Sequence, residues 1–474
     1  VSSIIENGMV DGSFQHGTAH YEKRGIADEV PEWQPDMCIQ CNQCAYVCPH
    51  AVIRPFLLDE EEMKKAPEGM PTIKALGRGM DGLEYKIQVS PLDCTGCSAC
   101  VDVCPAPRGK AIVMKSTQSQ IERNEIEYTD YLFNNVSYKD KILGKNTVKG
   151  SQFAKPLFEF SGACAGCGET PYIKLVTQLF GERMIVANAT GCSSIYGASA
   201  PSSPYTTAES GCGPAWASSL FEDNAEYGYG MFQAVNTIRL RILKRMEEIK
   251  ADVSSELADL FTIFAENFYD GDKTTEIRDE LVILLEKENN ENPNEKVKKN
   301  TQEILELKQY LIKKSMWMFG GDGWAYDIGF GGLDHVLASG DDVNVLVLDT
   351  EVYSNTGGQS SKSSRAGAVA KFAASGKPVK KKDLAAILMT YGNIYVAKVS
   401  MGANQNQTLK AVREAEAYPG PSIIIAYSPC IEHGIKAGMG KFQTEEKLAT
   451  EVGYWPIFRY DPRLAEKGKN PLQL

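Results

Sequence analysis

The pattern of apolar and polar positions changes near residue 156. Over residues 156–474, short apolar runs alternate with stretches of helical periodicity, which is typical of a doubly wound α/β domain with a mostly parallel sheet. A charged helical excursion over about 231–314 interrupts this alternation, with helices expected at 231–250 and 301–314 and a loop at 288–295. Apolar runs of strand length predict buried parallel strands at 184–188, 316–319, 343–348, 395–399 and 423–426.

The first 155 residues follow a different pattern. Turn-forming stretches predict an irregular lead-in over residues 1–36. Residues 37–115 concentrate the cysteines and predict a small compact domain, whereas residues 116–155 are polar and weakly patterned, which favours a linker. A chain of 474 residues is long enough for this small domain and the α/β domain to have separate cores.

Composition and charge narrow the classes of function. The net charge of −11 argues against nucleic acid as the main partner, and the lysine-rich stretch 377–382 is expected to be a solvated loop. No apolar run approaches the ~18 residues that cross a bilayer, so we expect no membrane segment. The chain begins with Val1 and shows no signal-peptide pattern, which favours a processed chain or a piece of a longer protein.

The thirteen cysteines are the main candidate chemistry, since the five histidines form no zinc-like pair. Residues 38–49 are CIQCNQCAYVCP and residues 94–105 are CTGCSACVDVCP, and both have the C-x2-C-x2-C-x3-C-P spacing of two-cluster bacterial ferredoxins. In that arrangement three thiolates of a motif hold one 4Fe–4S cluster and the fourth reaches the other cluster. A zinc site or a disulfide framework is the weaker alternative, because the motif is complete twice.

These motifs therefore predict an α+β, two-cluster ferredoxin-like domain. One 4Fe–4S cluster is expected on Cys38, Cys41, Cys44 and Cys104, and the second on Cys94, Cys97, Cys100 and Cys48. No function is predicted for residues 49–93, which lie between the motifs.

A second constellation lies at the ends of two predicted strands. GGDG at 320–323 follows one strand, and DTEVYSNT at 349–356 ends another. Ligands of a doubly wound sheet bind beyond the carboxyl ends of its strands. The Asp322 carboxylate, the Thr350 hydroxyl and the Val352 carbonyl can therefore meet as oxygen ligands of Mg²⁺. Gly321 and Gly323 allow a phosphate to approach the backbone closely.

An isolated GDG is more often an ordinary turn, but this one follows a strand and has an oxygen-rich strand end as its partner. The combination resembles the thiamine-diphosphate motif, in which an asparagine stands where this chain has Thr350. Asn355 and the Gly-Gly-Gln at 357–359 follow in the same loop. We expect Asn355 to contact substrate and Gly357 to contact the cofactor.

Together the two constellations resemble the C-terminal part of the pyruvate:ferredoxin (flavodoxin) oxidoreductase family, also called pyruvate synthase. Matching strings run from near residue 12 to the C-terminus and include EKRGIADEVPEW, GACAGCGETPY, AVAKFAASGK and SPCIEHGI. The resemblance implies conversion of pyruvate, coenzyme A and oxidised ferredoxin or flavodoxin to acetyl-CoA, CO₂ and the reduced carrier, with thiamine diphosphate and Mg²⁺ as cofactors.

The resemblance also implies a part that this chain lacks. The pyrimidine-binding and coenzyme-A-binding domains are expected in an N-terminal half outside the chain, so the chain alone is expected not to turn over pyruvate. We expect a homodimer in an anaerobic cytoplasm, and an organelle such as a hydrogenosome is also compatible. Two alternatives stay open: the same chemistry on another 2-oxoacid, and an electron-transfer subunit without turnover.

Five cysteines remain outside the ferredoxin motifs. Cys192 and Cys430 each follow a predicted strand, which puts them on the edge that carries the metal ligands, and Cys164 and Cys167 precede a helix that can reach this edge. We therefore expect a third 4Fe–4S cluster on these four residues, and the resemblance agrees. A redox dithiol is the alternative for the CxxC pair. Cys212 follows no strand and is expected to be a buried small residue or a loop thiol.

The resemblance further places the loop after Cys192 beneath the cofactor. Ser193 and Ser194 are then cofactor contacts and Ile195 an apolar wedge, although an isoleucine after a strand is more often plain core. Cys192 and Asn355 are the candidate catalytic residues.

Overall fold

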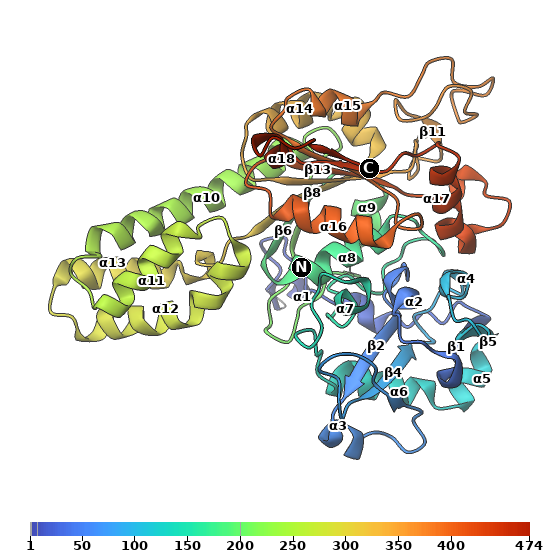
Figure 1. The fold of residues 1–474 in the computed structure, drawn as a ribbon, viewed down its shortest axis with the longest axis horizontal. Coiled ribbons are helices and arrows are strands. Elements are labelled where there is room, and N and C mark those ends of the chain that lie inside the picture. Colours follow the sequence, from blue (N-terminus) through green and yellow to red (C-terminus); the bar gives the residue numbers. More distant parts are fainter. Residues whose placement is uncertain (1, 7, 200) are drawn as a thin grey trace.

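The structure is a computed structural model that describes residues 2–6, 8–199 and 201–474. Figure 1 shows three lobes: a large sheet domain, a smaller lobe formed by the first part of the chain, and an elongated bundle of helices on one side. The sheet domain lies between the other two lobes and connects them. The ends of its strands determine where the candidate side chains of this domain meet. Among the described residues, no helix is both long and apolar enough to cross a bilayer.

Eight strands of the described chain form the central sheet, in the order β7, β6, β8, β9, β13, β12, β14, β15. The first six are parallel to one another, whereas β14 pairs antiparallel with β12 and β15 antiparallel with β14. The prediction of a mostly parallel α/β sheet is confirmed. The bounds are β6 Met184–Asn188, β7 Ala215–Ser218, β8 Ser315–Gly321, β9 Asn344–Asp349, β12 Tyr395–Val399, β13 Ser422–Tyr427, β14 Phe458–Tyr460 and β15 Leu472–Gln473.

All five predicted strands are confirmed, and their ends differ from the predicted ones by no more than two residues. The sequence pattern missed β7, β14 and β15. These strands are short, lie toward the edges of the sheet and are only partly buried, so no continuous apolar run marks them.

Both faces of the sheet carry helices, because successive side chains of a strand point to opposite faces. Val186 and Trp317 face helices α8 (Thr170–Phe180) and α16 (Gln405–Glu416) in one core. Ala187 and Met318 face α14 (Phe330–Ala338) and α15 (Leu384–Met389) in the other core. Figure 1 shows these pairs of helices on opposite sides of the strands. Burial on both faces explains why the interior positions of the central strands are mostly apolar.

The projecting bundle confirms the predicted helical excursion. It consists of α10 Asn224–Ile249, α11 Ser255–Glu266, α12 Gly271–Glu291 and α13 Glu295–Glu306. Its core is separate from those of the sheet and includes Ile242, Phe261, Leu281 and Ile304. The lobe is therefore a packed unit of its own.

Two details of the bundle differ from the prediction. The loop expected at 288–295 is shorter, because α12 continues to Glu291 and the Asn294 side chain already caps the next helix by accepting from the Lys296 amide. The helix expected at 301–314 ends at Glu306, and a short 3-10 turn leads into β8.

The smaller lobe holds the two cysteine motifs on α2 (Gln43–Tyr46) and α4 (Ala99–Val103). Strand β1 (Glu29–Trp33) pairs with β5 (Ile112–Ser116). Residues 49–93 contribute helix α3 (Glu60–Lys64) and a three-stranded sheet of β2 (Ile53–Leu58), β4 (Glu84–Val89) and β3 (Ile73–Lys74). The lead-in expected to be irregular over 1–36 therefore contains a paired strand.

Residues 116–155, expected to be a linker, contain three helices: α5 Thr117–Glu122, α6 Glu125–Asn135 and α7 Val148–Ser151. Tyr128 and Leu132, one helical turn apart on α6, are buried against Phe56 and Leu58 of β2. A polar segment with so few apolar positions gives a weak sequence pattern. This explains why the sequence predicted a linker here instead of helices. Three further helices of the chain are α1 Ser2–Glu6, α17 Phe442–Glu451 and α18 Pro462–Glu466.

Buried charges fasten the smaller lobe to the sheet domain. Arg54 on β2 forms an ion pair with Glu159, and both side chains are almost fully buried. Lys174 of α8 donates to the carbonyls of Ala45 and Tyr46 at the end of α2. These contacts fix the position of the cysteine motifs relative to the sheet.

Replacing Arg54 by methionine should destabilise the chain by about 3–5 kcal/mol, because Glu159 would be left as a buried, uncompensated charge. Thermal unfolding followed by circular dichroism measures the change. Arg278→Met is the matched control, since Arg278 pairs with Asp279 at the surface and should have little effect. Equal losses of stability in the two variants would contradict the role given to the buried pair.

Candidate active site and cysteine sites

The eight cysteines of the ferredoxin-like motifs line two cavities, and each cavity combines cysteines from both motifs. One cavity is lined by Cys38, Cys41, Cys44 and Cys104, with Trp33 and Tyr85 in its wall. The other is lined by Cys48, Cys94, Cys97 and Cys100, with Pro31 and Ile53. The structure therefore brings together the two quartets expected from the spacing.

The two motifs also share a backbone shape. Gln40 and Gly96 adopt left-handed conformations at matching positions, with φ of 56° and 69°. Their amides donate to the sulfurs of Cys38 and Cys94, in both cases at 3.4 Å. Amides directed at sulfur are the contacts that orient and tune thiolate ligands.

The donor set of the two cavities fits iron–sulfur clusters. Burial raises the pKa of the Cys94 thiol to about 12 and that of Cys97 to about 11, so thiolates here need a positive group to stabilise them. Within the described ranges, no three His, Cys, Asp or Glu side chains converge tightly enough to hold a single metal ion. Four sulfurs around one cavity instead suit a multi-iron cluster, whose ligands stand further apart.

A third group of cysteines comes from distant parts of the sheet domain. Cys192 begins helix α9 (Cys192–Gly197) after β6, and Cys430 follows β13. Burial raises the pKa of the Cys192 thiol, and the negative groups Glu169, Cys167, Cys430 and Cys164 raise it further, in that order. The thiols of Cys167, Cys430 and Cys164 are thus within electrostatic reach of Cys192; that the four share one cluster stays a prediction. Cys212 lies apart on an exposed turn, so it is a loop thiol and not a buried residue.

Glycines let the CxxC segment reach Cys430. The Gly168 amide donates to the Pro429 carbonyl, and a Cβ at Gly168 would lie 2.5 Å from that oxygen. Gly166 has a φ of 75°, and a Cβ there would lie 2.6 Å from the Met439 carbonyl. Side chains at either position would therefore separate Cys164 and Cys167 from the loop of Cys430.

The third quartet adjoins the second. The Gly166 amide is directed at the Cys97 sulfur. His50 Nε2 lies 3.0 Å from the Ala163 carbonyl, and the His50 carbonyl accepts from the Phe160 amide at 2.9 Å. Residues 160–166 are thus in contact with the lining of the second cavity, and the three quartets follow one another in space.

The three expected magnesium ligands meet at the carboxyl ends of β8 and β9. Asp322 Oδ1 accepts from the Thr350 amide at 3.2 Å and from the Thr350 hydroxyl at 3.1 Å. The same hydroxyl lies 3.0 Å from the Val352 carbonyl and 2.6 Å from the Ser354 hydroxyl. A carboxylate, two hydroxyls and a carbonyl around one point suit a hard cation such as Mg²⁺.

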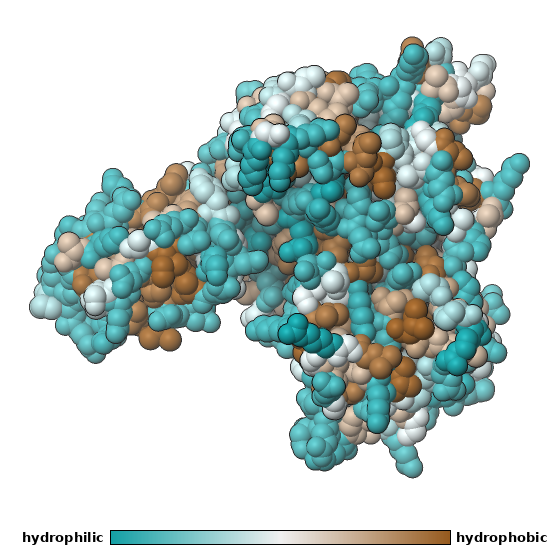
Figure 2. All heavy atoms as spheres, viewed as in Figure 1, coloured by the Kyte–Doolittle hydropathy of each residue, from teal (hydrophilic) through white to brown (hydrophobic). Residues whose placement is uncertain are grey.

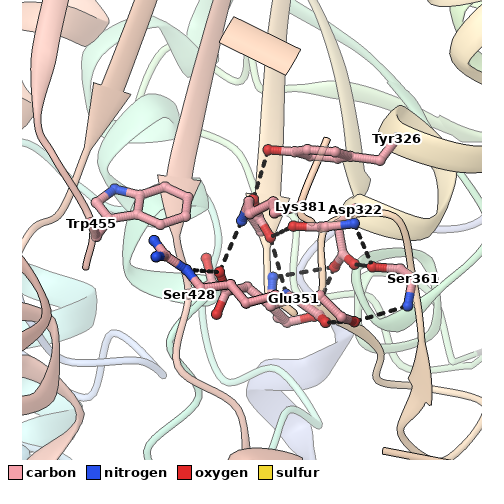
Figure 3. Close-up of polar contacts among 12 residues, drawn as sticks. Asp322, Tyr326, Glu351, Ser361, Lys381, Ser428 and Trp455 are labelled. Carbon is pink, nitrogen blue, oxygen red and sulfur yellow. Dashed lines mark hydrogen bonds and ion pairs between the residues drawn. The ribbon is translucent and has the colours of Figure 1, made fainter. Parts of the chain in front are cut away.

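A network of buried charges supports this point (Figure 3). Ser361 donates to Asp322 Oδ2, and Lys381 donates to both Asp349 and Glu351 at 2.9 Å. Burial and the neighbouring Asp349 raise the pKa of Asp322 well above its usual range. Burial also acts on Asp349, but Lys381 and hydrogen bonds keep the pKa of that carboxyl low. Negative charge on Asp322 is therefore favoured once a cation is present.

The stretch 377–382 is a loop, as the sequence suggested, but only residues 378–380 of it are exposed. Lys381 is partly buried and forms ion pairs with Asp349 and Glu351, and Lys377 donates to the Ser364 carbonyl from a buried position. Lys382 donates to the Tyr326 carbonyl and lies over the ring of Phe330. A run of lysines hides such differences, because the pattern does not show which of them faces a carboxylate.

The loop expected beneath the cofactor forms the first turns of α9. Ser193 accepts from Asn188, and Ser194 caps the helix through Gly191, so both hydroxyls already have partners in the chain. Ile195 is 50% exposed and is not plain core. Asn355 is exposed near the metal-ligand candidates, and Gly357 has a φ of 108° that favours glycine.

His433 is a site residue that the sequence argument missed. As the Nε2–H tautomer, its ring donates to the Thr350 carbonyl at 2.5 Å, and Nδ1 accepts from the Cys430 amide at 3.3 Å. One imidazole thus bridges the magnesium candidates and a cysteine of the third quartet. Its place in SPCIEHGI, three residues after Cys430, was the available signal.

Comparisons with known proteins support both constellations. Residues 37–107 match the 4Fe-4S dicluster domain, and residues 306–426 match the thiamine pyrophosphate enzyme, C-terminal TPP binding domain. The chain therefore carries a 4Fe–4S domain and a thiamine-diphosphate-binding domain, as predicted.

The chain is also similar to longer proteins along its whole length. Pyruvate-flavodoxin oxidoreductase of Klebsiella pneumoniae is 56% identical and covers 100% of this chain, which spans 39% of that protein. Pyruvate:ferredoxin oxidoreductase of Moorella thermoacetica is 56% identical over 98% of this chain, again 39% of the relative. The mitochondrial NADP-linked pyruvate dehydrogenase of Euglena gracilis is 50% identical over 98% of this chain and 25% of its own length.

Proposed function

We propose that this chain, a member of the pyruvate-flavodoxin/ferredoxin oxidoreductase family, supplies the diphosphate-and-metal half of a thiamine site and three 4Fe–4S clusters to an enzyme that oxidises pyruvate. One observation carries the proposal. The oxygen cluster around Asp322 and the third cysteine quartet share one edge of the sheet, and His433 contacts both. An electron carrier alone has no use for the oxygen cluster.

Each group of residues at this site has its own role in the proposed enzyme. Asp322, Thr350 and Val352 would hold Mg²⁺, and through it the diphosphate of the cofactor. Bound thiamine diphosphate would supply the carbanion chemistry that releases CO₂ from a 2-oxoacid. Ile195 would support the cofactor from its apolar side, and Asn355 would face the substrate. His433 would fix the position of the loop that contains Thr350 and Val352 relative to the loop that contains Cys430.

The cysteine quartets would hold clusters that accept and pass single electrons. Cys430 of the third quartet is linked to the oxygen cluster through His433, the quartet with Cys97 adjoins the third quartet, and the quartet with Cys38 shares its motifs with the second. The three quartets thus form a row that leads from the proposed thiamine site into the smaller lobe. We propose ferredoxin or flavodoxin as acceptor, coenzyme A as acyl acceptor, a homodimer as the assembly and an anaerobic cytoplasm as the setting.

Another 2-oxoacid is the second candidate substrate. The relatives that match are named for pyruvate, whereas the substrate pocket is expected largely in the part of the enzyme outside this chain. The third candidate, an electron-transfer subunit without turnover, is disfavoured by the buried oxygen cluster.

The test is an anaerobic assay of the full enzyme. Pyruvate and coenzyme A together should reduce flavodoxin or ferredoxin, the protein should contain about twelve iron atoms for each copy of this chain, and paramagnetic resonance should show three clusters. Preference for another 2-oxoacid would correct the substrate. Full iron content without magnesium-dependent thiamine binding would overturn the proposal in favour of an electron-transfer subunit.

Replacing Cys212 by alanine should leave the iron content and the resonance spectrum unchanged, because this thiol is exposed and lies on a turn before β7. Iron counting on the purified full enzyme measures the result. Loss of a whole cluster would show that the third quartet is assigned wrongly.

A further inference from the structure

Residues 49–93, here called the insert, separate the two cysteine motifs in sequence but contact the first motif in space. Gln40 lies beside Cys41, and the insert holds both polar atoms of its side-chain amide. Nε2 donates to the Lys74 carbonyl and Oε1 accepts from the Leu76 amide, in both cases at 2.8 Å. Gln40 is only 1% exposed, so these bonds satisfy its amide where water does not reach it.

Asn42, on the other side of Cys41, is held in a similar way. The Tyr85 hydroxyl of β4 donates to Asn42 Oδ1 at 2.6 Å, and Asn42 Nδ2 donates to the Lys149 carbonyl at 2.9 Å. Tyr85 also lines the cavity of the quartet with Cys38. The insert thus forms part of the wall of this cavity and fixes the residues on both sides of one of its cysteines.

The backbone at these two positions is one that favours glycine. Gln40 has a φ of 56° and Asn42 a φ of 61°. The second motif has the same shape, with a φ of 69° at Gly96 and 60° at Ser98, but a different environment: a Cβ at Gly96 would lie 3.1 Å from the Glu29 carbonyl. Gln40 therefore stands where glycine would be unstrained, and the contacts of its side chain with the insert compensate for the unfavourable backbone.

The two cavities also differ in what covers them. Residues 160–166 of the sheet domain contact the lining of the cavity with Cys97. The insert lies in the smaller lobe, with α3 at the end that points away from the sheet domain (Figure 1), and this end of the molecule faces solvent (Figure 2). The insert thus covers one side of the quartet with Cys38, as the sheet domain covers one side of the quartet with Cys97.

We propose that the insert, through Gln40 and Asn42, lowers the reduction potential of the 4Fe–4S cluster on the quartet with Cys38. The proposal rests on the proposed function, because it requires a cluster on this quartet. Reduction adds one electron to a group that four thiolates already make negative, so the exclusion of water disfavours the reduced form. A cluster of lower potential passes its electron more readily to an acceptor. Gln40 and Asn42 are thus positioning residues for the proposed electron transfer.

The test is the substitution Gln40→Gly in the full enzyme. Glycine adopts the left-handed backbone readily, and Gly96 shows that a glycine amide at this point of the motif still donates to the cysteine sulfur. The substitution therefore removes the contacts with the insert and keeps the bond to sulfur. Redox titration followed by paramagnetic resonance should show one cluster with a less negative potential and the others unchanged. Pulsed resonance in D₂O should show more exchangeable deuterium near that cluster.

Asn42→Gly is the second variant, and Ser98→Gly is its control at the matching position of the second motif, where the hydroxyl donates to the Cys97 carbonyl. Asn42→Gly should shift the potential in the same direction as Gln40→Gly, and the control should not shift it. Unchanged or more negative potentials in both variants, or an equal shift in the control, would overturn the proposal.

Two further outcomes separate this proposal from the proposed function. Failure of both variants to bind the cluster would overturn the proposal, since the insert would then serve the assembly of the cluster and not its potential. Unchanged potentials in variants that still oxidise pyruvate would refute the role of the insert alone. An unaltered enzyme without 4Fe–4S signals would refute the proposed function, and the role of the insert with it.

Discussion

Replacing Asp322 by asparagine is expected to lower pyruvate oxidation by more than about 10³-fold, because the residue would no longer offer Mg²⁺ a charged ligand. The change is nearly isosteric, yet it disturbs the site in a second way. Both carboxylate oxygens of Asp322 now accept hydrogen bonds, one from Thr350 and the other from Ser361. An asparagine amide must direct its NH₂ group at one of these donors, so it cannot reproduce the arrangement.

Calorimetric titration of the full enzyme with thiamine diphosphate and Mg²⁺ measures this effect directly. Asp341→Asn is the matched control, since Asp341 lies before β9 at the opposite end of the sheet and accepts from Tyr229 and Gln233. The control should bind the cofactor normally, and both variants should keep all their iron. Normal binding by Asp322→Asn would refute the assignment of this carboxylate.

Replacing Cys430 by serine should remove the third cluster and lower the iron content by about one third, since four of twelve thiolate ligands belong to that site. Acceptor reduction by pyruvate should then fall to the background, because the proposed path of electrons from the thiamine site runs through the quartet that His433 links to the oxygen cluster. The two clusters of the ferredoxin-like lobe should still give their resonance signals after chemical reduction.

The Cys430→Ser variant is compared with Cys212→Ala, which removes a thiol without a partner in the quartets. Iron analysis, resonance spectra and acceptor reduction are read on the same preparations. Full iron content in the Cys430 variant, or a loss of signals from all sites alike, would contradict a separate third cluster.

The sequence predicted much of this architecture for physical reasons that concern particular residues. Strands buried on both faces consist mostly of apolar residues, so 184–188 and 395–399 could be bounded without error. The cysteine quartets followed from spacing and from the rule that parallel strands end at one edge. That rule grouped Cys192 with Cys430, although β8 and β9 separate their strands in the sheet.

The residues that escaped prediction are those whose role depends on a partner far along the chain. Lys381 is one of several lysines, and only the fold shows that it faces Asp349 and Glu351. His433 contacts Thr350 through a bond that spans 83 residues of sequence. Helix α6 was missed because it buries few side chains. A local sequence pattern predicts well which residues are buried. It predicts poorly which polar residues pair with partners far along the chain.

The spread of the third quartet has a consequence for how the domain folds. Its cysteines lie in two segments, 164–192 and residue 430, with most of the sheet domain between them. A cluster across this distance would act as a covalent cross-link that closes a very long loop, and such closures remove conformational freedom from the unfolded chain. Because His433 connects the Cys430 loop to Thr350, oxygen damage to the cluster would loosen the magnesium loop too. Redox injury and cofactor loss would then be a single event in the inactivation of the protein.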